Sequence, residues 1–425
     1  MRSTSAVLLS VAASLSSIGF ASRAPAVTCD AIAGKSDGGA PAPVVYVEGA
    51  NAVGPFLAPL QQALSVATDP IDIVYVGDGG CLGASNFFAG KSISAKPKPI
   101  YYAGQVAQTC DLPASAPNGG PLVADIAASD VYATSCGTIP GGQLPDYIGD
   151  FLGPLQPMAF VVPKASTQAA ISASAAYFVF GFGSSSGVAP WIVNESIYRR
   201  NETSAVQALL AVAIGVPITR WAGVDAGQLS TNVNAGLSGA AAVINALESD
   251  PDPEQAVGIL AMTNIDTTTA SHLDVLAYKD FGQSCAYYPD STPTAHDKAN
   301  VRDGHYALWG PIHFFTYVDE HGVPKNPLVA RVISYVTQTA VVPGGLDLIQ
   351  VEAQQNLVPS CAMTVTRSVE MGPLSSVAPA GACGCYYDYV ATGASSCRRC
   401  TKRSDCPASA PICNVSQPVG FCETQ

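Results

Sequence analysis

The order of local patterns along the chain restricts its fold more than any single motif does. A β-branched run, a turn of small residues and an apolar helical segment follow one another at residues 44–64 and again at 71–88. Further strand-like runs follow at 121–130, 158–162, 197–200 and 257–262, and helices are expected at 167–180, 205–214, 237–247 and 329–337. Strands that alternate with helices predict a mainly parallel sheet covered on both faces, so we expect an α/β fold.

The first 26 residues predict a secretory signal peptide. The apolar stretch at 6–21 is too short and too rich in serine to span a bilayer, and Ala24-Pro25-Ala26 has the form of a cleavage site. No later run of about 18 apolar residues is free of charges and helix breakers, so we expect no membrane span. Residues 27–43 are rich in glycine, alanine and proline and predict a flexible leader.

Composition points to an exported protein. The chain has a net charge of −12 and no basic stripe, which argues against a nucleic acid as its partner. Charged residues make up 12% of the chain, about half the usual share in soluble proteins. Because disulfides can replace surface ion pairs in an exported chain, we expect a secreted or periplasmic protein of the cell envelope.

The 13 cysteines predict a separate module at the C-terminal end. Six lie before residue 370, and seven lie between residues 383 and 422. In an exported chain they predict disulfides, with one thiol left over because the total is odd. The Cys397-x-x-Cys400 pair lacks a nearby histidine or second pair, so we expect neither a metal nor a cofactor. We expect a Cys-rich module at 379–425, joined by a connecting segment at 346–378.

Several turns in the chain are suited to binding an anion through backbone N–H groups. The start of a helix offers unpaired N–H groups and about half a positive charge, and small residues let a ligand approach the backbone. The candidate turns are Ala52-Val53-Gly54, Gly79-Gly80-Cys81, Ser204-Ala205-Val206 and the region of Ser238. Glycine turns occur in every α/β protein, so each of these turns alone is weak evidence.

Arg199-Arg200, directly before the helix expected at 205–214, is a more specific signal. An arginine in this place can bind an oxyanion with two hydrogen bonds while the helix start supplies N–H groups. On a strand the two side chains point to opposite faces, so only one of them would enter a cleft. A pair of basic residues on the surface remains the alternative.

Four segments resemble motifs of the phosphate-binding proteins of bacterial phosphate ABC transporters, in the type 2 periplasmic-binding superfamily. They are Gly49-Ala50-Asn51-Ala52-Val53-Gly54-Pro55, Tyr75-Val76-Gly77-Asp78-Gly79-Gly80-Cys81, Ala124-Asp125-Ile126-Ala127-Ala128-Ser129-Asp130 and Arg199-Arg200-Asn201-Glu202-Thr203-Ser204-Ala205. Their order and spacing agree with the family over about residues 44–340.

The resemblance implies a two-lobe solute-binding domain at 44–345. Lobe 1 would comprise about 44–155 and 270–345, and lobe 2 about 156–269. Two crossings, near Gln156 and near Thr263, would act as a hinge, and a ligand held by both lobes would stabilise closure.

By the same resemblance, the ligand is inorganic phosphate or a similar oxyanion. Arg200 would bind it and Ser204 would donate its hydroxyl, while N–H groups near Val53, Gly80, Ala205 and Val206 would complete the cage. Asp130 would accept a hydrogen bond from a protonated oxygen, which hydrogen phosphate has and sulfate at neutral pH lacks. Taken alone, Asp130 would be an ordinary loop or cap aspartate.

The match to the family is incomplete at the hydroxyl positions. Gly80 stands where the family commonly has serine, Val53 and Val206 replace hydroxyl residues, and Ala205 replaces glycine. Each missing hydrogen bond is worth about 1 kcal/mol net, or more for a charged acceptor. Because the backbone donors remain, anion binding is expected to survive these changes more readily than selectivity for phosphate.

Two other functions are compatible with the sequence. The Cys-rich tail favours a non-catalytic envelope or surface interaction protein on the same fold. The segment Gly183-Ser184-Ser185-Ser186-Gly187 fits the nucleophile elbow of a secreted serine hydrolase, but that elbow needs a strand before it and a helix after it. The residues before it are expected to be helical, which argues against a hydrolase, so we predict a binding protein without enzymatic activity. We expect a monomer that passes its ligand to an ABC permease or serves in sensing.

Overall fold

The computed structural model describes residues 27–32, 42–137, 143–224, 236–265, 272–379 and 381–424. The signal peptide expected at 1–26, most of the leader expected at 27–43 and the lobe boundary expected at residues 269 and 270 lie outside the described residues. Among the helices of the described segments, none is both long and apolar enough to cross a membrane.

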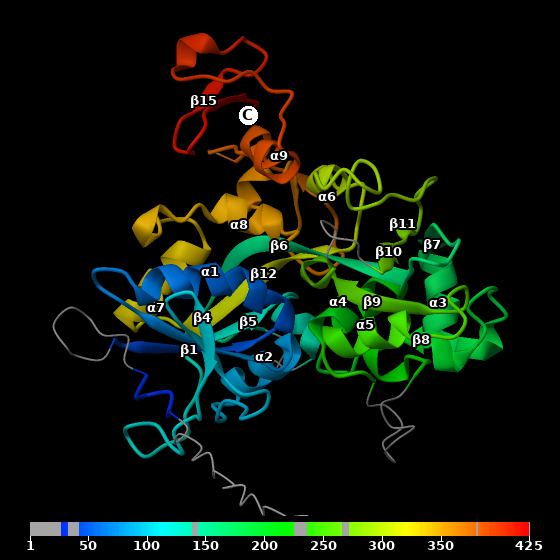
Figure 1. Cartoon of the computed structure of the whole chain (residues 1–425), viewed down its shortest axis with the longest axis horizontal. Helices are drawn as coiled ribbons and strands as arrows, with labels where there is room; N and C mark the ends of the chain where they lie inside the picture. The colour runs from blue at the N-terminus through cyan, green and yellow to red at the C-terminus, as the bar shows by residue number, and fades with distance from the viewer. Residues whose placement is uncertain are drawn as a thin grey trace, which may run out of the picture.

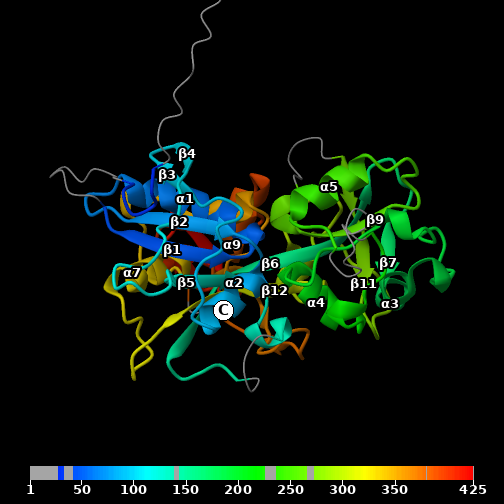
Figure 2. The same ribbon diagram turned by 90° about the horizontal axis from the view of Figure 1, so that it is seen from below.

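One long strand connects two lobes of strands and helices (Figure 1). It is β6 (Ile148–Pro163), which lies between the lobes when the molecule is seen from below (Figure 2). Its first ten residues pair with β12 (Trp309–Tyr317). The residues that follow pair with β9 (Val257–Ala261). The same strand therefore belongs to the sheet of each lobe, and the two-lobed α/β fold is confirmed.

The first lobe contains the strand order β4-β3-β2-β1-β5-β12-β6. Its other strands are β1 (Val44–Gly49), β2 (Asp72–Gly77), β3 (Ile100–Ala103), β4 (Val106–Thr109) and β5 (Ile126–Ser129). Its helices are α1 (Gly54–Ser65), α2 (Gly80–Phe88), α7 (Pro327–Val336) and α8 (Leu348–Gln354). Alternate residues of β1 point to opposite faces, so Val45 and Val47 share a core with α1, α7 and α8, whereas Tyr46 shares one with α2.

The second lobe is built on the other half of β6. Its strands are β7 (Ala170–Ser172), β8 (Ile197–Tyr198), β9, β10 (Leu273–Val275) and β11 (Ala277–Lys279), and its helices are α3 (Ala173–Phe182), α4 (Ala205–Ile214) and α5 (Ala240–Glu248). Residues 270–345 were expected in the first lobe, but β10 pairs with β6 and β11 with β7, so the second lobe extends at least to Lys279. Phe160 and Val162 of β6 pack with α3 and α4, while Ala159 and Val161 pack with α5 on the opposite face. The sheet of this lobe is thus covered on both faces, as the alternating patterns predicted. The expectation of a mainly parallel sheet is wrong, because β6 pairs antiparallel with β9, β10 and β12 while the parallel pairs of the large sheet are β1–β2, β1–β5 and β8–β9.

Two helix starts differ from those expected from the sequence. The helix expected at 167–180 is α3, which begins at Ala173 because the Ser172 hydroxyl accepts a hydrogen bond from the Ala175 N–H at 3.1 Å and caps it. The helix expected from 237 is α5, which begins at Ala240 because Leu237 still bridges to Arg200 and Gly239 adopts a φ of 79°. The Gly183–Gly187 segment is a 3₁₀ turn directly after α3, so the strand that a nucleophile elbow requires does not precede it.

Six disulfides occur among the described residues, as the cysteine pattern predicted. They are Cys29–Cys110, Cys81–Cys136, Cys361–Cys383, Cys385–Cys397, Cys400–Cys413 and Cys406–Cys422. The remaining cysteine, Cys285, is an exposed thiol. The sulfurs of Cys400, Cys406 and Cys422 lie close together, but each is committed to a disulfide rather than to a metal.

The C-terminal module contains α9 (Gly384–Thr392) and the hairpin of β15 (Ile412–Asn414) and β16 (Phe421–Glu423). Between the lobes and this module lie α6 (Ala299–Arg302) and the short pair β13 (Val365–Thr366) and β14 (Ser375–Ser376). Helix α9 contacts α8 of the first lobe, and Tyr387 of α9 donates a hydrogen bond to the Leu357 carbonyl at 2.9 Å. The module is therefore packed onto the first lobe.

The packing of the second lobe can be tested with two valines on the helices that cover opposite faces of its sheet. Val243 of α5 is fully buried, whereas Val212 of α4 is 46% exposed. Val243→Ala removes two buried methyl groups and should lower the free energy of unfolding by about 2 kcal/mol, while Val212→Ala should change it by less than about 0.5 kcal/mol. Guanidinium unfolding followed by circular dichroism measures both, and equal effects would contradict this packing.

Candidate functional site

A small cavity lies where the two lobes meet. The first lobe lines it with Ala50, Asn51, Ala52, Gly79, Gly80 and Asp130, and the second lobe lines it with Arg200, Ser204, Ala205, Val206 and Asn264. Eight of the eleven residues predicted from the sequence are in this set. The cavity thus brings together turns that are far apart in the chain.

The remaining three predicted residues do not line the cavity. Val53 is fully buried in the core of the first lobe, and its N–H donates to the Ala50 carbonyl at 2.9 Å. Gly54 packs against the ring of Tyr75, and Cys81 is joined to Cys136. Ser238, proposed as a fourth turn, precedes α5 and is also not part of the lining.

In the first lobe, hydrogen bonds tie the ends of three strands together beneath the cavity. The Ala50 N–H donates to the Ala128 carbonyl at 2.9 Å, and the Gly79 N–H donates to the Gly49 carbonyl at 3.0 Å. The Asn51 side-chain amide donates to the Gly77 carbonyl at 2.5 Å. The carboxyl ends of β1, β2 and β5 therefore form one rigid wall, which is where ligands bind in open α/β sheets.

Glycine at the start of α2 allows the two lobes to touch. Gly79 has a φ of 126°, a backbone conformation that residues with a side chain rarely adopt. A Cβ there would also lie 2.9 Å from the Thr203 carbonyl oxygen. A Cβ on Gly80 would lie 2.8 Å from the Cβ of Ala205. The Cys81 N–H donates to the Thr203 carbonyl at 3.3 Å, so a backbone hydrogen bond joins the lobes directly.

In the second lobe, the start of α4 presents its donors to the cavity. Ser204 is the N-cap, and its hydroxyl oxygen accepts a hydrogen bond from the Gln207 N–H at 3.4 Å. The hydroxyl hydrogen remains able to donate. Ala205 and Val206 occupy the first two positions of the helix, where N–H groups have no carbonyl partner within the helix. These three residues supply donors without adding a full charge.

Arg200 of the second lobe places a buried cation in the lining of the cavity. The residue is 4% exposed, and its Nε donates to the Leu237 carbonyl at 3.3 Å. Burial lowers the pKa of Arg200 to about 10, partly opposed by Asp130, so the guanidinium stays charged at neutral pH. Arg199 is buried but does not line the cavity, in agreement with the expectation that only one arginine of the pair faces it.

Asp130 faces the cavity with an unused acceptor. It is 1% exposed, and its Oδ1 has no hydrogen-bond partner among the described residues. Burial raises the pKa of Asp130 to about 6, while a hydrogen bond with its own backbone and the charges of Arg200 and His313 oppose the rise. At neutral pH the site therefore contains a carboxylate oxygen that can accept a hydrogen bond.

The structure adds acidic groups that the sequence analysis did not single out as part of the site. Burial, followed by the nearby carboxylate of Glu48, raises the pKa of Asp78 to about 8, so Asp78 holds a proton at neutral pH. Glu370, in the segment expected only to connect domains, accepts hydrogen bonds from the Tyr132 N–H at 3.1 Å and the Ser135 hydroxyl at 3.3 Å. Burial raises the pKa of Glu370 to about 7. The protons that these groups hold reduce the negative charge near the cavity.

The cavity is closed around very little space. Its volume is about 10 Å³, which is room for a single water molecule. A tetrahedral oxyanion has five heavy atoms and needs more room than this, so it would fit only in a wider form of the cavity. Asn51 and Asn264, which the sequence analysis did not propose, lie in the 3₁₀ turns that follow β1 and β9 and also line the cavity. The Asn51 amide already donates to the Gly77 carbonyl.

Comparisons with known proteins give similarities of fold. No protein-family model matches the sequence, and no curated protein matches it. A putative phosphate ABC transporter substrate-binding protein with bound phosphate from Clostridium perfringens is 12% identical with a TM-score of 0.47, over 74% of this chain and 99% of that chain. An ABC-type phosphate transport receptor from Vibrio cholerae is 13% identical with a TM-score of 0.44, over 74% and 99% of the two chains. A possible phosphate binding protein from Planctomyces limnophilus is 11% identical with a TM-score of 0.41, over 74% and 92%.

The buried carboxylate of Asp130 should destabilise the folded protein at neutral pH. Its pKa is raised from 3.8 to about 6 on folding, so the folded state binds the proton more tightly and stability falls as the pH rises between these values. Asp130→Asn is neutral at every pH and should stabilise the protein by up to about 3 kcal/mol at pH 7, but by little at pH 4. Guanidinium unfolding of both proteins at the two pH values measures this. A loss of stability at pH 7 would mean that the carboxylate is already well satisfied.

Proposed function

We propose that this protein is an extracytoplasmic solute-binding protein that captures a small tetrahedral oxyanion, namely phosphate, by closure of its two lobes. The observation that carries the proposal is the convergence of two helix starts, from α2 and α4, with one buried arginine and one buried aspartate in a single cavity. Helix starts and arginine both favour an anion. Each lobe supplies part of the set, so neither lobe alone forms the site.

The aspartate favours an anion that carries a proton. A carboxylate repels a fully ionised oxyanion at short range, but it accepts a hydrogen bond from a protonated oxygen. The unpaired Oδ1 of Asp130 is such an acceptor, placed beside the donors of Gly80 and Ala205. Hydrogen phosphate offers both the acceptors and the one donor that this arrangement calls for, whereas sulfate at neutral pH offers acceptors only.

Lobe closure supports capture by enclosure. The Cys81–Thr203 hydrogen bond and the cavity of about 10 Å³ describe a form in which the lobes are in contact. The chain passes from the first lobe to the second within β6 and returns between β11 and β12. Thr263, near which the second crossing was expected, lies before that return and donates a hydrogen bond to the Gln156 side chain at 3.2 Å. Bending at these few connections would open the cavity, and a ligand bound by both lobes would stabilise the closed form.

Six disulfides support an oxidising compartment, outside the cytoplasm. There the net charge of −12 would oppose an anion at long range. Salt screens exposed charges beyond about 8–10 Å, so the short-range donors and Arg200 can still decide binding. The loaded form would be presented to a membrane permease of the ABC type or used in sensing.

Calorimetric titration of the mature protein with phosphate and with sulfate tests the proposal. Wild type should bind phosphate below millimolar concentration and prefer it to sulfate. Arg200→Gln should weaken phosphate binding about 10- to 100-fold, because a hydrogen bond to a charged group is lost. Arg331→Gln, which removes the same charge from a residue paired with Asp69 on the first lobe, is the matched control and should bind like wild type.

Asp130→Asn belongs in the same titration. It should weaken phosphate and strengthen sulfate, because the repulsive carboxylate becomes an amide. If no anion binds wild type below millimolar concentration, capture of an oxyanion is wrong. If sulfate binds wild type as tightly as phosphate, the role of Asp130 is wrong.

The Cys81–Cys136 disulfide should contribute to affinity as well as to stability. It joins the second residue of α2 to the turn that follows Asp130, and so holds two parts of the cavity wall together. Cys81→Ser/Cys136→Ser should therefore weaken phosphate binding several-fold, since the donors must be ordered on binding. Cys29→Ser/Cys110→Ser removes a disulfide of the same lobe outside the lining and should cost similar stability, about 4 kcal/mol, with unchanged affinity. Equal losses of affinity in the two variants would mean that the bond acts only on the lobe as a whole.

A further inference from the structure

A short basic stretch stands out on this acidic protein. Arg398, Arg399, Lys402 and Arg403 fall within six residues of the C-terminal module, and all four are exposed. The module at 381–424 holds four basic and three acidic residues, whereas the rest of the chain holds 16 basic and 29 acidic ones. The sequence analysis considered this tail only through its cysteines. We infer that these four residues, the basic surface, form a docking site for an anionic polysaccharide.

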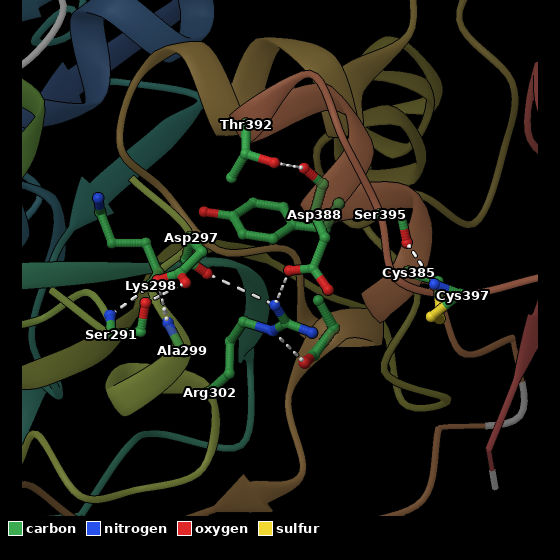
Figure 3. A network of polar contacts seen from close by, with 12 residues as sticks. Ser291, Asp297, Lys298, Ala299, Arg302, Cys385, Asp388, Thr392, Ser395 and Cys397 are labelled. Atoms are coloured by element: carbon green, nitrogen blue, oxygen red, sulfur yellow. Dashed lines mark hydrogen bonds and ion pairs between the residues drawn. A yellow bond between two sulfur atoms is a disulfide. The ribbon is translucent and has the colours of Figure 1, made fainter. Parts of the chain in front are cut away.

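The three acidic residues of the module offset only part of the charge of the basic surface. Glu423 is 3% exposed, and its carboxylate accepts the Cys385 N–H at 2.9 Å. Asp388 forms an ion pair with Arg302, on the side of the lobes (Figure 3). Asp405 accepts the backbone N–H groups of Thr401 at 2.9 Å and Lys402 at 3.1 Å. After the hydrogen bond from Thr401, the charge of Lys402 is also among the causes that lower the pKa of Asp405, so Asp405 offsets one of the four cations, and the basic surface keeps a net positive charge.

Disulfides and aromatic contacts hold the basic surface in place. Cys397, Cys400 and Cys406 alternate with the basic residues along the chain, and each is in a disulfide. The Arg399 guanidinium lies 5.2 Å from the centre of the Tyr389 ring, and the Arg398 carbonyl accepts the Cys422 N–H at 2.8 Å. Because the backbone is already ordered, binding would cost less conformational entropy than binding by a flexible basic tail would.

The module also presents this surface away from the anion cavity. In Figure 1, β15 stands on the far side of α9 from the lobes, and the body of the protein meets the module at α8 and α6. The Arg302–Asp388 ion pair and a hydrogen bond of 3.1 Å from Arg302 Nε to the Ala362 carbonyl fix this attachment (Figure 3). A polymer bound to the module would therefore leave the cleft between the lobes free.

The chemistry favours a polyanion over a lipid bilayer. Three of the four residues are arginine, whose planar fork binds phosphate, sulfate or carboxylate groups with two hydrogen bonds. Peripheral binding to a bilayer usually combines basic residues with exposed apolar or aromatic side chains. Here Tyr386 and Phe421 are buried at 3% and 1% exposure, and among the described residues of the module Val415 is the large hydrophobic residue that is exposed. The basic surface therefore offers charge, but Val415 is the one large exposed apolar side chain among the described residues of the module that could enter a bilayer.

Retention at the cell envelope is the use that this surface suggests. The sulfur of Cys29, near the start of the mature chain, is bonded to Cys110 and so is not free to carry a lipid. Binding to an anionic polysaccharide would keep a soluble binding protein where its ligand arrives. This inference is independent of which ligand the cavity takes.

The test uses the full-length mature protein and heparin as a sulfated polysaccharide probe. Wild type should bind immobilised heparin at low ionic strength and dissociate as salt is raised, because the attraction is electrostatic. The variant with Arg398, Arg399, Lys402 and Arg403 all changed to serine should bind at least tenfold more weakly. The matched control changes four exposed basic residues of the lobes to serine, namely Lys91, Lys96, Arg220 and Lys325, and should bind within about twofold of wild type.

Several results would overturn the inference. One is that wild type does not bind heparin at low salt. Another is that the two variants lose heparin affinity equally, and a third is that wild type binds anionic phosphatidylserine vesicles in preference to heparin. Unchanged near-ultraviolet circular dichroism of both variants shows that they are folded. Phosphate titration of the same variants keeps the two proposals apart, because loss of heparin binding should leave phosphate affinity unchanged.

Discussion

The double pairing of β6 is the constraint on which the rest of the structure depends. One half of this strand hydrogen-bonds with β12 in the first lobe, and the other half with β9 in the second. The carboxyl ends of β1, β2 and β5 therefore face the start of α4, and residues from position 50 to position 264 meet in one cavity. A second consequence is that motion between the lobes is confined to a few connections. The proposed capture by closure rests on this arrangement more than on any one side chain.

Within that frame, the electrostatics of the site resolve an apparent conflict. An acidic chain is a poor general attractor of anions, and the cavity wall itself contains a carboxylate. Burial opposes the ionisation of Asp78, Asp130 and Glu370, and so lowers the negative charge that these groups place near the cavity. Arg200 stays charged because its pKa remains about 10 despite burial. The N–H groups at the starts of α2 and α4 can then bind an anion with less repulsion from the nearby carboxylates.

The sequence predicted the fold and much of the cavity lining for a clear reason. Strand and helix periodicity is local, and the glycine, serine and arginine positions at the ends of these elements are visible in the chain itself. Gly80, Ser204 and Arg200 line the cavity because strand ends and helix starts meet at the same edge of a sheet. Val53 could not be placed in this way, since its N–H is used in a 3₁₀ turn that only the three-dimensional structure reveals.

Contacts between distant segments were beyond the reach of local patterns. Glu370 reaches the turn after Asp130 from a segment that follows both lobes, and no periodicity connects the two. The pairing of Cys81 with Cys136 and the close approach of Gly80 to Ala205 likewise depend on how the lobes are packed. The last of these contacts explains how one lobe can touch the other at the cavity. Gly80 has no side chain, and the methyl group of Ala205 lies against it.

A crystal structure of the protein grown in the presence of phosphate tests the central claim most directly. The account predicts tetrahedral density between the lobes, in contact with the Arg200 guanidinium, the Asp130 carboxylate and backbone N–H groups of Gly80 and Ala205. It also predicts a slightly wider cavity than the present one. Lobes closed on each other with no density at this place, or phosphate bound elsewhere on the protein, would contradict it.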